Sequence, residues 1–180
     1  MNVTYNLIMS LNLGYDPHKD LCMPKDYSAS VEDFVAEYRD KVSDLSNILL
    51  VLLREEFFSH KDLRLFALWC AQQVMHLMKD QRSLDALIIA EKFAFGDATE
   101  DELLAARREA CSAFCDYFFE GSAFCAVAAV YSDDISDAAY GMVWADAVYS
   151  DDAKAGIQNS QIDKLLEILH KPDGKWFVRT

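Results

Sequence analysis

The fold is decided by residues 61–78, which read KDLRLFALWCAQQVMHLM. Apolar side chains recur here at steps of three and four residues, which places them on one face of a helix. They are Leu63, Phe66, Ala67, Cys70, Val74, Leu77 and Met78. Polar residues such as Arg64, Gln72 and Lys79 lie elsewhere around the helix. The pattern therefore predicts an amphipathic helix that packs into a core.

Two further helices follow this stretch along the chain. An apolar pattern over 84–95 ends at Gly96, a residue type that commonly terminates helices because it adopts a left-handed conformation without strain. Thr99 and Glu102 then form the sequence of a capping box, in which each side chain pairs with the other's backbone N–H. A helix is therefore predicted over 100–119.

Two shorter helices are predicted before residue 61. Ser30, with Asp33 three residues later, and Ser43, just before an apolar run, can accept the unpaired N–H groups of a first helical turn. We therefore expect helices over 31–41 and 44–58. Leucine and isoleucine recur at helical spacing in the second, which is expected to reach the core.

The fold class follows from these helices and from the scarcity of turn residues, with six Gly and three Pro in 180 residues. Further helices are predicted over 122–130, 135–149 and 160–170, the last beginning at Ser160. Short turns favour antiparallel packing of neighbours. The prediction is an all-α, single-domain antiparallel bundle of about six to eight helices. Its parts are an N-terminal arm and loop (1–27), a helical core (28–171) and a C-terminal tail (172–180).

The N-terminal segment carries a different pattern. Residues 3–13 alternate between apolar and polar side chains, and only Ile8 breaks the alternation. A period of two is typical of a half-buried strand. The other extended candidate is residues 176–178. Either the two segments pair, or the first docks as an extended or helical arm, and residues 14–27 are expected to form an irregular loop.

The chain is acidic, with 30 Asp and Glu against 17 Lys and Arg and a formal net charge of −13. Binding to phosphates needs clustered basic side chains, so this composition argues against nucleic acid as a direct ligand. Apolar residues make up 52% of the chain, which excludes a mainly disordered protein.

Neither a membrane span nor a signal peptide is expected. The sequence has no run of about eighteen apolar residues, and its first residues lack basic side chains. The five cysteines do not resemble a secreted disulfide framework. Cys111 and Cys115 share a helix face and could form a zinc pair, but buried apolar roles are favoured. We expect a reduced, intracellular, cytoplasmic protein without membrane contact.

Most of the negative charge is concentrated in residues 97–152. This segment has thirteen acidic and two basic residues, so 2 − 13 gives a net charge of −11. One interpretation is an acidic face that attracts a protein partner with a basic surface. The alternative is a solvated face that serves only solubility, and the two are weighed evenly.

Aromatic residues in the same segment favour an interface slightly, because Tyr and Trp are frequent at binding hot spots. At helical spacing they could equally belong to the core. The candidate partner-binding residues are Tyr131, Asp133, Asp134, Asp137, Asp146, Tyr149, Asp151 and Asp152.

No catalytic, cofactor or metal site is predicted. The sequence lacks a Gly-x-Ser-x-Gly motif and a Gly-rich phosphate loop. Its Asp clusters lack the spacing, Gly and final Glu of a calcium loop. The four histidines are too dispersed in the sequence to indicate a ligand set. We therefore expect a protein that is not an enzyme.

Four segments together resemble a family of helical bacterial immunity proteins. They are 63–71, 80–83, 90–99 and 102–107, so the resemblance lies mainly within 63–110. It implies an all-helical fold and a role in a toxin–immunity (toxin–antitoxin) system, in which the protein blocks a partner without chemistry of its own. The second half of the chain departs from the family, with acidic and aromatic clusters in place of Ala- and Trp-rich runs.

The leading hypothesis is a non-enzymatic intracellular protein that neutralises a protein partner by occlusion. The alternative is a phage or mobile-element inhibitor that mimics nucleic-acid charge and blocks a host nucleic-acid-binding defence protein. A third, weaker hypothesis is an enzyme or metal-dependent protein whose site forms only in the fold. Homo-oligomerisation stays open.

Overall fold

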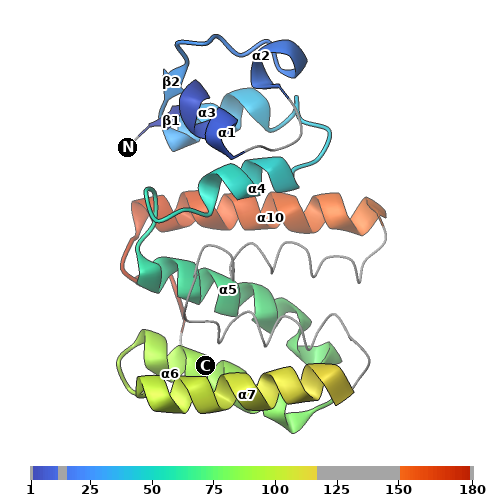
Figure 1. Ribbon diagram of the computed structural model, residues 1–180, viewed down its shortest axis with the longest axis vertical. Helices are drawn as coiled ribbons and strands as arrows, with labels where there is room; N and C mark the ends of the chain where they lie inside the picture. Colours follow the sequence, from blue (N-terminus) through green and yellow to red (C-terminus); the bar gives the residue numbers. More distant parts are fainter. Residues whose placement is uncertain (1, 12–15, 117–150, 179–180) are drawn as a thin grey trace.

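Figure 1 shows the protein as a computed structural model, which describes residues 2–11, 16–116 and 151–178. Within these residues the chain forms eight α-helices and a small two-stranded sheet, so the predicted helical bundle is confirmed. The helices are α1 (Tyr5–Ser10), α2 (Pro17–Asp20), α3 (Val31–Tyr38), α4 (Ser46–Leu52), α5 (His60–Val74, extended by a 3₁₀ turn, Met75–Leu77), α6 (Gln81–Ala94), α7 (Glu100–Asp116) and α10 (Asp151–His170). The helices predicted over 122–130 and 135–149 lie outside the described residues.

The larger helices form a stack in which the order in space differs from the order in sequence (Figure 1). The last helix, α10, lies between α4 and α5 and contacts both. Beyond α5 the stack continues with α6 and then α7, each packed on the helix before it. The N-terminal elements lie on the far side of α4, which α3 contacts. Sequence neighbours therefore pack together from α5 to α7, whereas α10 is inserted between α4 and α5.

The helix predicted from residues 61–78 is confirmed as α5, and it is more deeply buried than the sequence suggests. Leu63, Leu65, Phe66 and Leu68 are at most 1% exposed, because α10 and α6 both pack on this helix. The expectation that Arg64 lies away from the core was wrong. Its side chain is buried, and the guanidinium lies 4.7 Å from the centre of the Phe93 ring of α6. Burial lowers the pKa of Arg64.

The predicted stop at Gly96 is confirmed in its geometry. Gly96 has a φ of 79°, the left-handed conformation, and its N–H donates to Phe93 O at 3.0 Å. The N–H of Asp97 donates to Lys92 O at 2.8 Å. These two bonds pair carbonyl groups that the last turn of α6 would otherwise leave unsatisfied.

Of the two predicted serine caps, one is confirmed and one was wrong. Ser30 Oγ accepts the N–H of Asp33 at 3.1 Å and caps α3. Ser43 does not cap α4, because Asp44 supplies the acceptor for the N–H of Ser46 at 2.9 Å. The helix also ends at Leu52, shorter than predicted, and the chain then turns back on itself.

The N-terminal segment combines two of the expected conformations. Val3–Thr4 forms β1 and pairs antiparallel with β2 (Ser28–Ala29), so residues 176–178 are not its partner. Of the alternatives left open, the strand is limited to two residues and a helix follows it, because Thr4 Oγ1 accepts the N–H of Leu7 at 3.2 Å and starts α1. The expectation of an irregular loop over 14–27 was wrong at Pro17–Asp20, which form α2 with Asp16 as its cap. Ile8, which breaks the alternation, is the residue that α1 buries.

The last helix starts nine residues earlier than predicted, at Asp151 rather than Ser160. Ser160 lies inside the helix, where its hydroxyl donates to Gly156 O at 3.1 Å. A serine can satisfy its hydroxyl on the carbonyl four residues earlier, and the helix then continues through it. The same residue type therefore signals a helix start in one context and a helix interior in another.

Candidate partner-binding surface

The structure leaves most of the predicted partner-binding residues untested. Tyr131, Asp133, Asp134, Asp137, Asp146 and Tyr149 lie outside the described residues. Asp151 and Asp152 are the first two residues of α10, and their side chains are also outside the description. Of the acidic segment, the structure describes the beginning, residues 97–115.

That part of the acidic segment lies along the last described helix of the stack. Leu103, Ala110 and Ala113 are fully buried, and α7 packs on α6. Five acidic side chains are exposed on α7 and in the turn before it, and one of them, Glu102, caps the helix. The other four are Asp97, Glu100, Asp101 and Glu109, and we call them the acidic edge. Leucine and alanine at helical spacing bury one side of α7, so the acidic residues between them lie toward solvent.

A fifth acidic residue, Glu102, is held by the start of the helix. Its Oε2 accepts the N–H of Thr99 at 2.7 Å and the hydroxyl of Thr99 at 2.9 Å, while its own N–H donates to Thr99 Oγ1 at 3.2 Å. The predicted capping box is therefore confirmed. Hydrogen bonds from the backbone and side chain of Thr99, and the charge of Lys92, hold the pKa of Glu102 below its ordinary value. Glu102 fixes the first turn of α7 and thereby the position of Glu100 and Asp101.

Few positive charges accompany the acidic edge. Arg108 is exposed on α7, Arg107 is half-buried, and Lys92 is exposed at the end of α6. Glu100 and Asp101 lie in the first turn of α7, where the helix dipole favours negative charge. The helix dipole therefore offsets part of the repulsion between these carboxylates.

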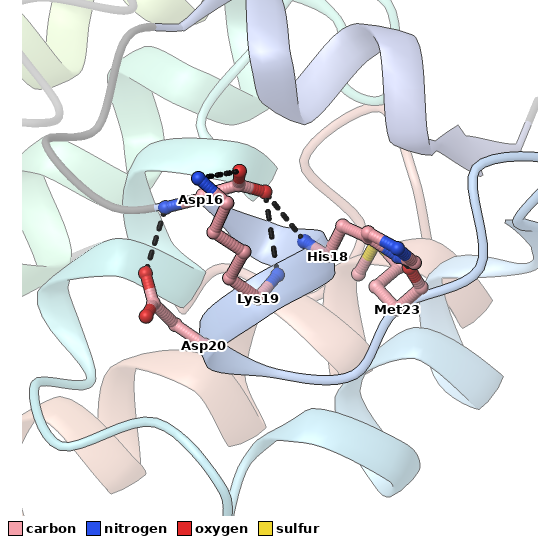
Figure 2. A network of polar contacts seen from close by, with 5 residues as sticks. All are labelled: Asp16, His18, Lys19, Asp20 and Met23. Carbon is pink, nitrogen blue, oxygen red and sulfur yellow. Dashed lines mark hydrogen bonds and ion pairs between the residues drawn. The ribbon is translucent and has the colours of Figure 1, made fainter.

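A second polar network surrounds α2 and is accounted for by local structure (Figure 2). Asp16 Oδ1 accepts the N–H groups of His18 at 2.9 Å and Lys19 at 3.3 Å, and the N–H of Asp16 donates to Asp20 Oδ2 at 2.8 Å. His18 Nδ1 lies 2.8 Å from Met23 O. Although desolvation opposes it, the bonds from His18 and Lys19 lower the pKa of Asp16. These contacts close one helical turn and the loop after it.

Among the residues that the structure describes, the most enclosed carboxylate is Asp62, which sequence analysis did not single out. It is 1% exposed, at the start of α5, and both of its oxygens accept hydrogen bonds. Oδ1 accepts the N–H of Gly174 and the indole N–H of Trp176, each at 2.9 Å. Oδ2 accepts the Ser59 hydroxyl at 2.7 Å and the N–H of Asp173 at 2.9 Å. With four donors around it, Asp62 joins α5 to the C-terminal turn.

The sequence contained one signal for this cluster. Ser59 and Asp62 have the spacing of a capping box, and the N–H of Asp62 donates to Ser59 Oγ at 3.1 Å. The partners in the C-terminal turn had no such signal, because they are more than a hundred residues away. Asp173 and Gly174 have φ values of 64° and 76°, and their successive N–H groups point at the same carboxylate. Such a concavity of backbone N–H groups binds anions.

Groups of metal ligands and membrane-spanning helices are both absent from the described ranges. There, no three His, Cys, Asp or Glu side chains are grouped so that they could hold a metal ion. None of the described helices is both long and apolar enough to cross a membrane. Cys111 and Cys115, the conceivable zinc pair, are half-buried and exposed on α7.

Comparison with known proteins finds no matching family model, no matching curated protein and no matching solved structure.

Proposed function

We propose that this chain is a non-enzymatic, cytoplasmic protein that binds a basic protein partner and neutralises it by occlusion, as the immunity proteins that it resembles are expected to do. The observation that supports this most directly is the acidic edge. Asp97, Glu100, Asp101 and Glu109 are exposed, while the other side of α7 is buried. In sequence the acidic edge continues into residues 116–152, where the other predicted contact residues lie.

The physical argument is electrostatic. Like charges that are clustered on one surface repel one another and lower the stability of the folded chain slightly. The same cluster raises the association rate with a basic partner, by about 10- to 1,000-fold at low ionic strength. A well-capped helix at the end of the stack holds these charges in fixed positions before the partner arrives, which reduces the entropy lost on binding.

The experiment compares the wild-type chain with a variant in which Glu100, Asp101 and Glu109 are each replaced by Lys. Glu102 is kept, because it caps α7. A control variant carries Glu32→Lys, Asp40→Lys and Asp26→Lys, three exposed acidic residues outside the segment. Both variants change the net charge by the same amount. Each chain is immobilised and incubated with a lysate of the native host, and bound proteins are identified and quantified.

We expect the wild type and the control to retain the same basic protein, and the α7 variant to retain at least about tenfold less of it at low salt. Circular dichroism should show unchanged helix content in all three chains. Equal capture by all three chains would contradict a role for the acidic edge.

Occlusion is tested separately, with the protein identified by capture. Co-expression of the wild-type chain should restore growth of cells that produce this protein in a toxic amount, and the α7 variant should restore less. Duplex DNA should not displace the captured protein. Displacement by DNA would instead favour the alternative, an inhibitor that mimics nucleic-acid charge.

A further inference from the structure

The helix α10 is packed unevenly along its length. In its second half, Ile162, Leu165 and Ile168 are at most 1% exposed. Among residues 154–160, the buried side chain is that of Gln158, and Gln161 follows at the midpoint, both 3% exposed. Between α4 and α5, the second half of α10 therefore buries aliphatic side chains, whereas the first half buries amide side chains.

The buried amide of Gln161 is incompletely paired. Gln161 Nε2 lies 3.7 Å from the sulfur of Cys70 in α5, which is a weak hydrogen bond. Within the part of the chain that the structure describes, Gln161 Oε1 has no hydrogen-bond partner. Burying a polar atom without a partner costs free energy, because its bonds to water are lost and not replaced. The first half of α10 thus gains less from docking than the second half.

The first half is also a weak helix by composition. Gly156, Asn159 and Ser160 all have low helix propensity, and glycine is the least favourable of them. No atom lies within 4 Å of the position that a Cβ of Gly156 would occupy, so the absent side chain is not required for packing. Low helix propensity and the burial of an unpaired polar atom therefore both destabilise the first half of α10.

Polar contacts at the edges hold this segment in place. Arg39, which follows α3, donates from Nε to Asn159 Oδ1 at 2.6 Å and from Nη2 to Asn159 O at 3.0 Å, while its Nη1 donates to Asp163 Oδ1 at 2.6 Å. Lys154 Nζ lies 3.9 Å from Asp44 Oδ2. Both ion pairs are partly exposed, so solvent and salt weaken them. The other end of α10 is followed by the turn whose N–H groups bind the buried Asp62.

We infer that residues 154–161 form a latch that opens from α4 and α5 as a unit, while residues 162–176 stay docked through the aliphatic face and Asp62. Opening exposes the parts of α4 and α5 that this segment covers, and it breaks the link from Arg39 to Asn159. The inference concerns a conformational device in the fold and does not rest on the proposed function.

The test is hydrogen exchange of the full-length chain under native conditions, read for peptides within 154–161, 162–170 and α5. Residues 154–161 are expected to open at least about tenfold more often than α5, and with a smaller dependence on denaturant concentration, because less surface is exposed than in global unfolding. The latch does not exist if these three segments open with the same frequency and the same denaturant dependence.

Three variants then separate the causes. Gln161→Met removes the unpaired buried oxygen and should make opening of 154–161 about tenfold rarer without changing α5. Gly156→Ala should make it about fivefold rarer. Arg39→Ala should make it more frequent. If Gln161→Met disturbs the packing, Gly156→Ala still provides the test, since its side chain meets open space.

Ser83→Ala is the matched control. Ser83 is 1% exposed in α6, and its Oγ likewise has no partner within the described residues. Its removal should leave the difference between 154–161 and α5 unchanged. If Ser83→Ala altered that difference as much as Gln161→Met, or if neither Gln161→Met nor Gly156→Ala altered it, the latch would be refuted.

Discussion

The indole N–H of Trp176 donates a hydrogen bond of 2.9 Å to Asp62 Oδ1, although 114 positions separate the two residues in the chain. Trp176 is 6% exposed and Asp62 is 1% exposed, so the bond is shielded from water. The bond joins the turn after α10 to the first turn of α5, and so connects the C-terminal part of the chain to the centre of the stack. Bonds to a buried carboxylate are stronger than bonds between neutral groups.

Replacement of Asp62 by Asn should therefore destabilise the protein. The amide keeps one acceptor oxygen, but it places an NH₂ group opposite the donors of Ser59 and Asp173. We expect a loss of about 3 kcal/mol in the free energy of unfolding, measured by urea denaturation. Asp85→Asn, at an exposed carboxylate of α6, should change it by less than about 0.5 kcal/mol. Equal effects of the two substitutions would contradict a special role for Asp62.

Two glycines with the same backbone conformation provide a second prediction. Gly174 and Gly96 have φ values of 76° and 79°, which strain any residue with a Cβ. A Cβ on Gly174 would lie 2.8 Å from Leu65 Cδ1 and 2.9 Å from Lys61 Cε, whereas one on Gly96 would meet nothing within 4 Å. Gly96→Ala should cost about 1 kcal/mol, from backbone strain alone. Gly174→Ala should cost more by thermal unfolding, and an equal or smaller cost would show that the C-terminal turn can move.

Because α5 is deeply buried in the stack, replacing one of its large side chains by alanine should strongly lower the free energy of unfolding. Phe66 is fully buried, and its ring lies 6.1 Å, centre to centre, from that of Trp69. Phe66→Ala should lower the free energy of unfolding by about 3–5 kcal/mol, because it removes buried apolar surface and leaves a cavity. Ile88→Ala, at an exposed residue of α6, is the control and should change it by less than about 0.5 kcal/mol. Urea denaturation measures both.

The start of α6 should be sensitive to acid. Asp80 accepts hydrogen bonds from Arg82 Nη2 at 2.7 Å, Arg82 Nε at 3.0 Å and the N–H of Arg82 at 2.8 Å. The hydrogen bonds from the Arg82 side chain are the main reason why the pKa of Asp80 lies below its ordinary value. A lowered pKa in the folded state means that the carboxylate stabilises the fold above its ordinary pKa. This contribution is lost as the pH falls through the folded-state pKa.

The measurement is an NMR titration of the Asp80 carboxyl carbon, which should titrate below an exposed Asp. In Arg82→Gln the midpoint should return toward the ordinary value. Asp80→Asn should make the unfolding free energy less dependent on pH in the acid range. An Asp80 midpoint that is the same with and without Arg82 would disprove the assigned cause.

The sequence alone determined the features that depend on neighbours within one or two helical turns. The central helix, the stop at Gly96 and the capping box of Thr99 and Glu102 were all predictable, because the atoms involved are at most a few residues apart. The first strand was predictable as a conformation but not in its partner, β2. The acidic edge was visible as charge, and the structure added that its side chains are exposed.

Only the tertiary structure decided how distant segments meet. It places α10 between α4 and α5, buries Arg64 against Phe93, and surrounds Asp62 with donors from the last turn of the chain. None of these contacts follows from local spacing, because the burial of a residue depends on which helix arrives from elsewhere in the sequence. A polar side chain that looks solvent-facing on an isolated helix becomes interior when helices pack on both sides of it, as they do around α5.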